Sequence, residues 1–339
     1  MFHGTTHILQ NTNGCAILLQ AKFLSRFILT PGQEIQFLSP EKILEVDNMA
    51  DSAPQIYADI DWTSLRANAL ARKGWQEKGP AEWDQKAKSF AGRNKSAAYV
   101  DLVLSHMPLD PSFTVLDIGS GPGTLAIPMA KMVQSVTAID FSRGMLNTLE
   151  EIAWEEGIDN IQTVQCAWED DWQQKGLQPH DVAVASRSMG VKDLTAALYK
   201  INRYGTRYVF LTDRIGSTPF DEGAFKAIGR HFSPGPDYIY TLNILYTLGI
   251  YPNVTILKLE QDINYTSIAE AIKSYSWMFH EITPEENKAL EKYLTGKIIH
   301  SENGRVTVRR DSPPQWALIW WKNENVHQHP ICALPDDRA

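Results

Sequence analysis

The chain has 339 residues, 43% of them hydrophobic, and its 40 acidic side chains outnumber its 32 lysines and arginines, giving a formal net charge of −8. This composition allows a large core and leaves no basic block for the phosphates of a nucleic acid, so we expect no nucleic-acid partner. Three cysteines predict no disulfide framework, and the lack of a membrane-length apolar run or a secretory leader predicts a cytoplasmic protein with no membrane partner.

Residues 1–48 are predicted to form a small β-rich extension. Apolar residues cluster or alternate over 15–19, 23–29 and 34–38, and Thr30-Pro-Gly32 is typical of a turn. A segment of this size buries little core alone. We therefore expect it to pack on the rest of the chain or on a second subunit, and the second alternative predicts a homodimer.

Residues 49–108 are predicted to be a helical region ahead of the main domain. Aromatic side chains are spread along 62–107, at Trp62, Trp75, Trp83, Phe90 and Tyr99. They either pack the helices on the next domain or line a pocket. We favour packing for Trp62 and Tyr99, and both alternatives stay open for Trp83 and Phe90.

The segment Val115-Leu-Asp-Ile-Gly-Ser-Gly-Pro-Gly-Thr124 is the most informative part of the chain. A short strand leads into three glycines and then an apolar helix over 125–133, so a ligand can lie against bare backbone at a helix N-terminus. A phosphate loop would need Lys followed by Ser or Thr, and the dinucleotide pattern would need glycine at 124. Flavin, nicotinamide and sugar-nucleotide enzymes stay as alternatives. No basic residue stands between Asp117 and Lys131, so this acidic site favours a ligand that carries positive charge.

Four further strands are predicted to end near residues 140, 166, 185 and 211, with helices between them, which is typical of a parallel sheet with crossover helices. Ligands bind such sheets at the carboxyl ends of the strands. Asp140 is placed there for ribose hydroxyls. The other candidates around a nucleoside base are Phe141, Met145, Trp168, Glu169 and Ser186.

Structural roles compete with two of these assignments. A helix that starts at Ser142 could be capped by Asp140, and this role is compatible with ribose binding. Trp168 could be a core residue instead of a base-stacking one. Of the three consecutive acids at 169–171, at least one is expected to be simply solvated.

Residues 115 to about 215 resemble the core of a class I S-adenosylmethionine-dependent methyltransferase, through L-D-I-G-S-G-P-G, the acid at 140, the A-W-E-D segment and the later strands. The resemblance implies an α/β, Rossmann-like methyltransferase fold over residues 109–325. Its sheet would be seven-stranded and mostly parallel, with an antiparallel last strand and helices on both faces. It also implies S-adenosylmethionine as cofactor, with S-adenosylhomocysteine as product. The donor-binding residues would be Asp117, Gly119, Ser120, Gly121, Gly123, Asp140, Phe141, Met145, Trp168, Glu169 and Ser186.

The acceptor is expected to be a small molecule. The segment Glu82–Phe90 is similar to the lid helix of small-molecule methyltransferases, and an insertion at 214–252 would close over the strand ends with it. The Asn/Asp-Pro-Pro-Tyr/Phe sequence of enzymes that methylate nucleic-acid amines is missing. A methyltransferase acting on RNA or protein, and a non-catalytic donor-binding protein, are the alternatives. The substrate-binding candidates are Trp83, Phe90, Arg187, Tyr238 and Tyr240.

His231 is the candidate general base, with a structural role as its alternative, and a base is needed only if the nucleophile loses a proton. Helices are predicted over 225–231, 237–248, 267–279 and 284–294, and strands over 254–259 and 315–321. The tail, 326–339, holds His327, His329 and Cys332 at close spacing. We expect this tail to be disordered and the protein to bind no metal.

Overall fold

The computed structural model divides the chain into two units, Met1–Asp61 and Trp62–Ala339. It describes four short strands between residues 6 and 37, and residues 56–323 except 76–77, 94–96 and 280. In the described residues, every helix is too short or too polar to cross a bilayer.

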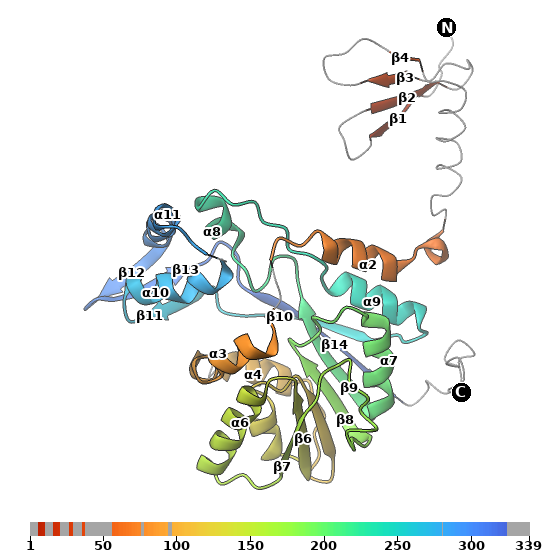
Figure 1. The fold of residues 1–339 in the computed structure, drawn as a ribbon, viewed down its shortest axis with the longest axis vertical. Helices are drawn as coiled ribbons and strands as arrows, with labels where there is room; N and C mark the ends of the chain where they lie inside the picture. Colours follow the sequence, from red (N-terminus) through yellow and green to blue (C-terminus); the bar gives the residue numbers. More distant parts are fainter. Residues whose placement is uncertain are drawn as a thin grey trace. The chain divides into compact units, whose positions relative to one another are not determined.

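The first unit contains a four-stranded antiparallel sheet whose strands follow one another in chain order (Figure 1). The strands are β1 (Thr6–Gln10), β2 (Ala16–Gln20), β3 (Phe27–Leu29) and β4 (Gln36–Phe37). The predicted β-rich character of this extension is confirmed, and β1 adds a strand that the sequence did not predict. A 3-10 helix, η1 (Tyr57–Asp59), comes before the second unit. A homodimer through residues 1–48 stays a prediction.

A seven-stranded sheet forms the centre of the second unit, in the order β10-β14-β9-β8-β5-β6-β7. The strands β5, β6, β7, β8 and β9 pair in parallel, and β14 is antiparallel to both of its neighbours. The predicted fold class is therefore confirmed. The bounds are β5 (Thr114–Ile118), β6 (Ser135–Asp140), β7 (Ile161–Gln165), β8 (His180–Ser186), β9 (Gly205–Arg214), β10 (Asn253–Lys258) and β14 (Gln315–Lys322).

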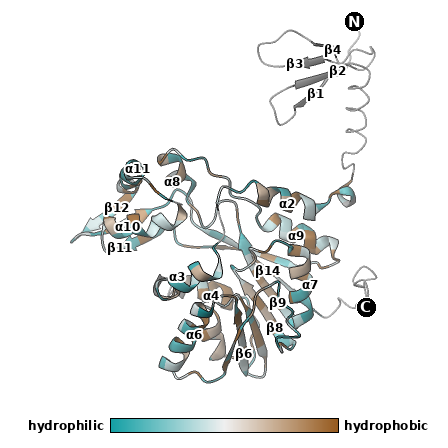
Figure 2. Cartoon of the chain, viewed as in Figure 1, coloured by the Kyte–Doolittle hydropathy of each residue, from teal (hydrophilic) through white to brown (hydrophobic). Residues whose placement is uncertain are grey.

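Helices cover both faces of this sheet because successive side chains of a strand point to opposite faces. Val182 and Val184 of β8 join a core with α4 (Ala97–Leu104), α5 (Ala126–Ala130) and α6 (Arg143–Glu155). Ala183 and Ala185 join the other core, with α7 (Leu194–Tyr204) and α9 (Tyr238–Thr247). Figure 2 shows hydrophobic residues along the central strands and hydrophilic ones on helices such as α6.

Two helices before the sheet contact helices of opposite faces. α2 (Trp62–Ala71) packs against α9, and α3 (Pro80–Arg93) packs against α6. Arg66 of α2 is buried and donates to the backbone carbonyls of Val191 and Lys192, at 2.7 and 3.0 Å, which fastens α2 to the segment after β8.

A third core lies in the C-terminal elaboration, which packs on α8 (Glu222–Ala227). The predicted helix pair is present as α10 (Ile268–Tyr275), extended by the 3-10 helix η2 (Ser276–Met278), and α11 (Pro284–Thr295). The sequence did not predict the accompanying sheet of β11 (Asp262–Tyr265), β12 (Ile298–Glu302) and β13 (Arg305–Arg309). The prediction of a helix over 225–231 was wrong in its bounds, because Asp221 caps the first turn of α8.

Candidate functional site

The glycine loop lies between β5 and α5, and its backbone requires glycine at three positions. Gly119, Gly121 and Gly123 have φ of 66°, 55° and 87°, the left-handed region that disfavours other residues. A Cβ on Gly119 would lie 2.4 Å from the Cβ of Ser188, and one on Gly123 would lie 2.8 Å from the Cγ1 of Ile127. At Gly121 the nearest atom would be 4.0 Å away, on Phe90. The middle glycine is therefore the place where a ligand can approach the backbone.

Asp140 connects the end of β6 to this loop. Its Oδ2 accepts from the amide of Gly121 at 2.9 Å and its Oδ1 accepts from the amide of Ser142 at 2.8 Å. The side chain is buried, and this burial raises the pKa of Asp140 even though both amides favour its charged form. The cap of α6 is Ser142, whose hydroxyl accepts from the amide of Met145, so Asp140 is not the cap.

Asp117 is a buried carboxylate whose Oδ2 has no hydrogen-bond partner among the described residues. Its carboxylate accepts from the amide of Ala126, while burial and the neighbouring Asp140 raise the pKa of Asp117 to about 7. A buried charge without a partner is costly, and a nearby cation removes that cost. The carboxylate of Asp117 therefore fits a ligand that carries positive charge, such as S-adenosylmethionine.

Helix α3 is fastened beside these acids through Asp84. The Oδ1 of Asp84 accepts from the hydroxyl of Ser142 at 2.6 Å and from the amide of Gly144 at 2.8 Å. These two hydrogen bonds lower the pKa of Asp84. The same helix carries Phe90, next to Gly121, and Trp83, whose ring centroid is 5.4 Å from that of Phe90. Both aromatic candidates are thus close to the glycine loop.

The segment after β7 is joined to the segment after β8 by Trp168. Its Nε1 donates to the carbonyl of Ser188 at 3.0 Å, and its ring lies 5.4 Å from that of Trp172 in the core. Trp168 therefore contributes to the core while it lies next to the residue that contacts Gly119. Glu169 beside it is exposed.

The remaining candidates for the base follow β6 directly. Phe141 is half-buried and follows Asp140, whereas Met145 is buried in the first turn of α6. The hydroxyl of Ser120 in the loop is buried and has no hydrogen-bond partner among the described residues.

The sequence reasoning missed two residues that meet near the ends of β8 and β9, Tyr99 of α4 and Thr212 of β9. The hydroxyl of Tyr99 lies 2.7 Å from that of Ser186 and 2.9 Å from that of Thr212. Thr212 also accepts from the amide of Arg187, whose guanidinium carbon is 4.3 Å from the centre of the Tyr99 ring. Tyr99 was expected to be core and is buried, but its hydroxyl bridges two strand ends. The available signal was Thr212 itself, a polar residue at a predicted strand end.

The tyrosine candidates lie on α9, under α2. The ring of Tyr240 is 6.4 Å from that of Trp62, and Tyr238 packs against the core on the α7 face. The described contacts therefore place them with the opposite face of the sheet from α3 and α6.

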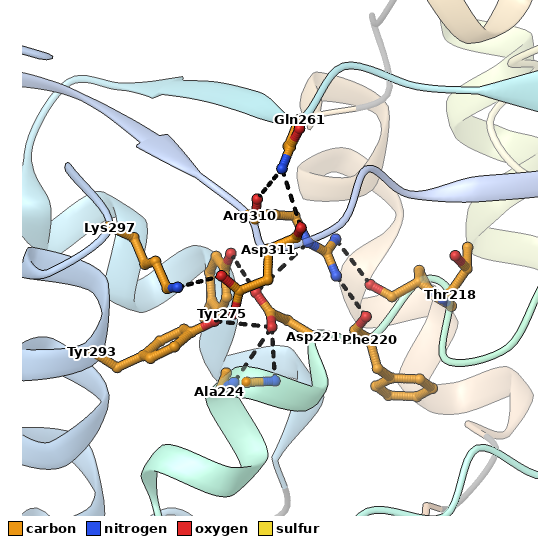
Figure 3. A network of polar contacts seen from close by, with 12 residues as sticks. Thr218, Phe220, Asp221, Ala224, Gln261, Tyr275, Tyr293, Lys297, Arg310 and Asp311 are labelled. Atoms are coloured by element: carbon orange, nitrogen blue, oxygen red, sulfur yellow. Dashed lines mark hydrogen bonds and ion pairs between the residues drawn. The ribbon is translucent and has the colours of Figure 1, made fainter. Parts of the chain in front are cut away.

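His231 is exposed and lines a cavity of about 750 Å³. The cavity is bounded by residues between 217 and 232 and by the segment 310–314. Figure 3 shows the polar network at its wall, where Asp221 accepts from the hydroxyls of Tyr275 and Tyr293, each at 3.1 Å. Arg310 donates to the carbonyl of Phe220 at 2.5 Å. This buried network fastens the C-terminal elaboration to α8.

In the part of the chain that the structure describes, no three His, Cys, Asp or Glu side chains are grouped to hold a metal ion. The tail residues His327, His329 and Cys332 lie outside the described residues.

Comparisons with known proteins match the strand and loop region and, for one relative, most of the chain. Residues 115–207 match a family described as "Methyltransferase domain". An uncharacterized protein of Haemophilus influenzae is 32% identical over 271 residues, which cover 79% of this chain and 98% of that protein. A probable ribosomal RNA small subunit methyltransferase A of Methanosphaera stadtmanae is 31% identical over 78 residues, covering 21% of this chain and 29% of that protein. Among solved structures, the YcgJ protein of Bacillus subtilis has a TM-score of 0.47 at 16% identity, covering 66% of this chain and 97% of that one.

Proposed function

Because this chain belongs to the class I S-adenosylmethionine-dependent methyltransferase family, we propose that it transfers the methyl group of S-adenosylmethionine to a small-molecule acceptor. The observation that carries the choice of acceptor is a partly open cavity at the carboxyl edge of the sheet. Its volume of about 750 Å³ falls within the range of roughly 300–1,000 Å³ typical of small-molecule sites.

The position of this cavity follows from strand pairing. β14 is antiparallel to β9, with Trp316 opposite Arg214, so residues 310–314 and 215–220 both continue past the carboxyl end of β9. The amide of Gln315 donates to the hydroxyl of Thr218 at 3.0 Å and holds the two segments together. The parallel strand β5, with the glycine loop at its carboxyl end, lies two strands away in the same sheet.

Aromatic side chains support an acceptor that is small and partly apolar. The ring of Phe220, which lines the cavity, has its centroid 5.4 Å from Trp75, 5.3 Å from Phe232 and 5.2 Å from Trp277. These rings come from the segment before α3, from the 214–252 insertion and from the C-terminal elaboration. Of these rings, Phe220 and Phe232 line the cavity, and Trp75 and Trp277 pack against Phe220 from two other segments. An aromatic lining supported in this way suits a small, partly apolar molecule better than RNA or a protein.

When bound, S-adenosylmethionine supplies an activated methyl group on a sulfonium. Asp140 would hold the ribose hydroxyls, and Asp117 would lie against the positive charge. Phe141, Met145 and Trp168 would border the base, and Gly121 would let the cofactor approach the backbone. The chain's contribution to the rate is positioning and exclusion of water, with Phe90 and Trp83 of α3 as the cover. If the nucleophile must lose a proton, His231 on the cavity wall is the candidate base.

The test is to incubate the full chain with methyl-labelled S-adenosylmethionine and a metabolite extract, and separately with total RNA and with protein. We expect label in a compound of low molecular mass, and less of it with an Asp140→Ala variant at a limiting donor concentration. Label only in RNA or protein would contradict the acceptor class. Donor binding by calorimetry without label in any fraction would point to a non-catalytic protein.

A further inference from the structure

Strand β10 is the last strand of the seven-stranded sheet, so one of its edges faces away from β14. Just past the paired residues, the amide of Leu259 donates to the carbonyl of Pro314 at 2.9 Å. Because alternate residues of an antiparallel strand bond to the same neighbour, the odd-numbered residues of β10 bond to β14. The N–H and C=O groups of Val254, Ile256 and Lys258 therefore point to the open edge, and they have no hydrogen-bond partner among the described residues.

The side chains beside this open edge are apolar. Val254 and Ile256 lie on the same face of β10 and are 37% and 39% exposed. Tyr251, just before the strand, is 65% exposed, and its ring lies 5.4 Å from that of Tyr246. Edge strands that stay unpaired usually carry a proline, a bulge or several charges. β10 has no proline, pairs with β14 without a bulge and carries one charge, on Lys258 at its last position, so its edge is suited to pair with another strand.

A second copy of the chain offers a strand that fits this edge. Two β10 strands related by a two-fold axis run antiparallel, so the unpaired donors of each strand meet the unpaired acceptors of the other. When Thr255 lies on the axis, Val254 is opposite Ile256 of the partner subunit. The outward N–H and C=O groups of these two residues then bond to each other, and their apolar side chains pack across the axis.

The charges near the edge allow this pairing, although the chain carries a formal net charge of −8. Residues 249–259 contain no acidic side chain, so two β10 edges bring no carboxylates together. The antiparallel arrangement also places the two Lys258 ammonium groups at opposite ends of the paired strands, where their repulsion is weak.

We propose that the chain forms a homodimer in which two β10 strands pair in this way and join the two seven-stranded sheets. This interface is separate from the one predicted through residues 1–48, and it does not rest on the proposed function. β10 runs parallel to β9, since both are antiparallel to β14. The two-fold axis reverses that direction, so the glycine loops of the two copies lie at opposite edges of the joined sheet.

The first test measures the mass of the full chain in solution by light scattering over a range of micromolar concentrations. We expect twice the mass of one chain, and a monomer for Ile256→Lys, which places two like charges beside the axis. The matched control is Ile299→Lys, which changes an isoleucine of β12 that is 48% exposed and should leave the dimer intact. Both variants should keep the native circular dichroism spectrum, which shows that they fold.

A dimer that Ile256→Lys leaves intact overturns the proposal, and so does an equal loss of the dimer in Ile299→Lys. A monomeric native chain overturns it as well. In that case amide hydrogen exchange separates the other occupants of the edge, because slow exchange in β10 means that a segment of the same chain covers it and fast exchange means that it is open.

The second test changes Thr255 to Cys and does not depend on breaking the dimer. In the proposed register this residue faces its own copy across the axis, with Cβ atoms roughly 4.5 Å apart, which is within reach of a disulfide. We expect mild oxidation to convert Thr255→Cys to a covalent dimer on a non-reducing gel. Lys258→Cys, on the same strand but away from the axis, is the control, and the native chain with its three cysteines gives the background. Equal cross-linking by both variants, or none by Thr255→Cys, overturns the pairing.

Discussion

The carboxylate of Asp140 accepts a hydrogen bond of 2.9 Å from the amide of Gly121, so the end of β6 holds the middle glycine of the loop after β5. An acid in this position can bind two vicinal hydroxyls and also sets the shape of the loop on which the cofactor lies. Both effects act on the same ligand.

We predict that Asp140→Ala lowers affinity for S-adenosylmethionine at least tenfold, which is about 1.4 kcal/mol. Asp140→Asn should lose less, because one acceptor oxygen remains. Isothermal calorimetry with the donor checks this, with Asp159→Ala as a control for loss of an exposed acid before β7. Unchanged affinity in Asp140→Ala would remove this residue from the donor site.

The raised pKa of Asp117 makes the unfolding free energy of the protein depend on pH. Its pKa in the folded protein is raised from 3.8 to about 7, so between these values the folded state keeps a proton that the unfolded chain has lost. The resulting stabilisation is complete below pH 4 and is lost as the pH rises through 7. Asp117→Asn is neutral at every pH. Relative to the native protein, we expect it to gain roughly 1–3 kcal/mol in unfolding free energy between pH 5 and pH 8.

Urea unfolding at the two pH values measures this gain, and donor binding provides the complementary result. A cation binds best to the ionised form of Asp117, so affinity of the native protein for S-adenosylmethionine should rise from pH 5.5 to pH 7. Asp117→Asn should bind more weakly, with a flatter dependence. If the difference in unfolding free energy between Asp117→Asn and the native protein were the same at both pH values, the pKa of Asp117 would not be raised by folding.

The parts of the fold that depend on local pattern could be predicted from the sequence. The loop from Gly119 to Gly123 was identified because glycines after a strand indicate a backbone conformation that other residues rarely adopt. All three glycines have positive φ. The strands of the parallel sheet were identified because buried strands are continuous apolar runs. Strand β9 runs to Arg214, past the predicted end near residue 211, because the last residues are polar and only pairing with β14 makes them regular.

Contacts between distant segments could not be predicted in this way. Asp84 was not a candidate, because its role depends on how α3 packs on α6, 58 positions from Ser142. The hairpin of β12 and β13 was missed although its turn, Asn303–Gly304, is a known hairpin signal and has φ of 50° and 81°. Its strands are mostly exposed, so they lack the apolar run that marked the others.

Alanine substitutions at Gly119 and Gly216 allow the cost of backbone strain to be measured separately from the cost of a steric clash. Both have positive φ, of 66° and 54°, but a Cβ on Gly119 would meet Ser188 at 2.4 Å whereas one on Gly216 has no atom within 4 Å. Gly216→Ala should cost only the backbone term, about 1–2 kcal/mol. We expect Gly119→Ala to cost more in urea unfolding and to abolish donor binding by calorimetry. Equal stability losses with donor binding intact in both variants would mean that the loop yields to the extra methyl group.

A substitution at Gly144 tests whether close packing of α3 on α6 is needed for donor binding. An added Cβ would lie 2.7 Å from the Cα of Asp84, a backbone atom that cannot rotate away, so Gly144→Ala must displace α3. The hydrogen bond between the amide of Gly144 and Asp84 would then lengthen, and Phe90 on the same helix would move from Gly121. We expect weaker binding of S-adenosylmethionine, by about tenfold, and faster amide hydrogen exchange in residues 80–93.

The matched control for this variant is Gly79→Ala, directly before α3, where an added Cβ meets no atom within 4 Å. It makes the same chemical change next to the same helix without forcing the helix to move, so its affinity and exchange should equal those of the native protein. If Gly144→Ala also matched the native protein in both measurements, α3 would be able to shift without effect on the donor. The cover over the glycine loop would then have to come from residues other than Phe90 and Trp83.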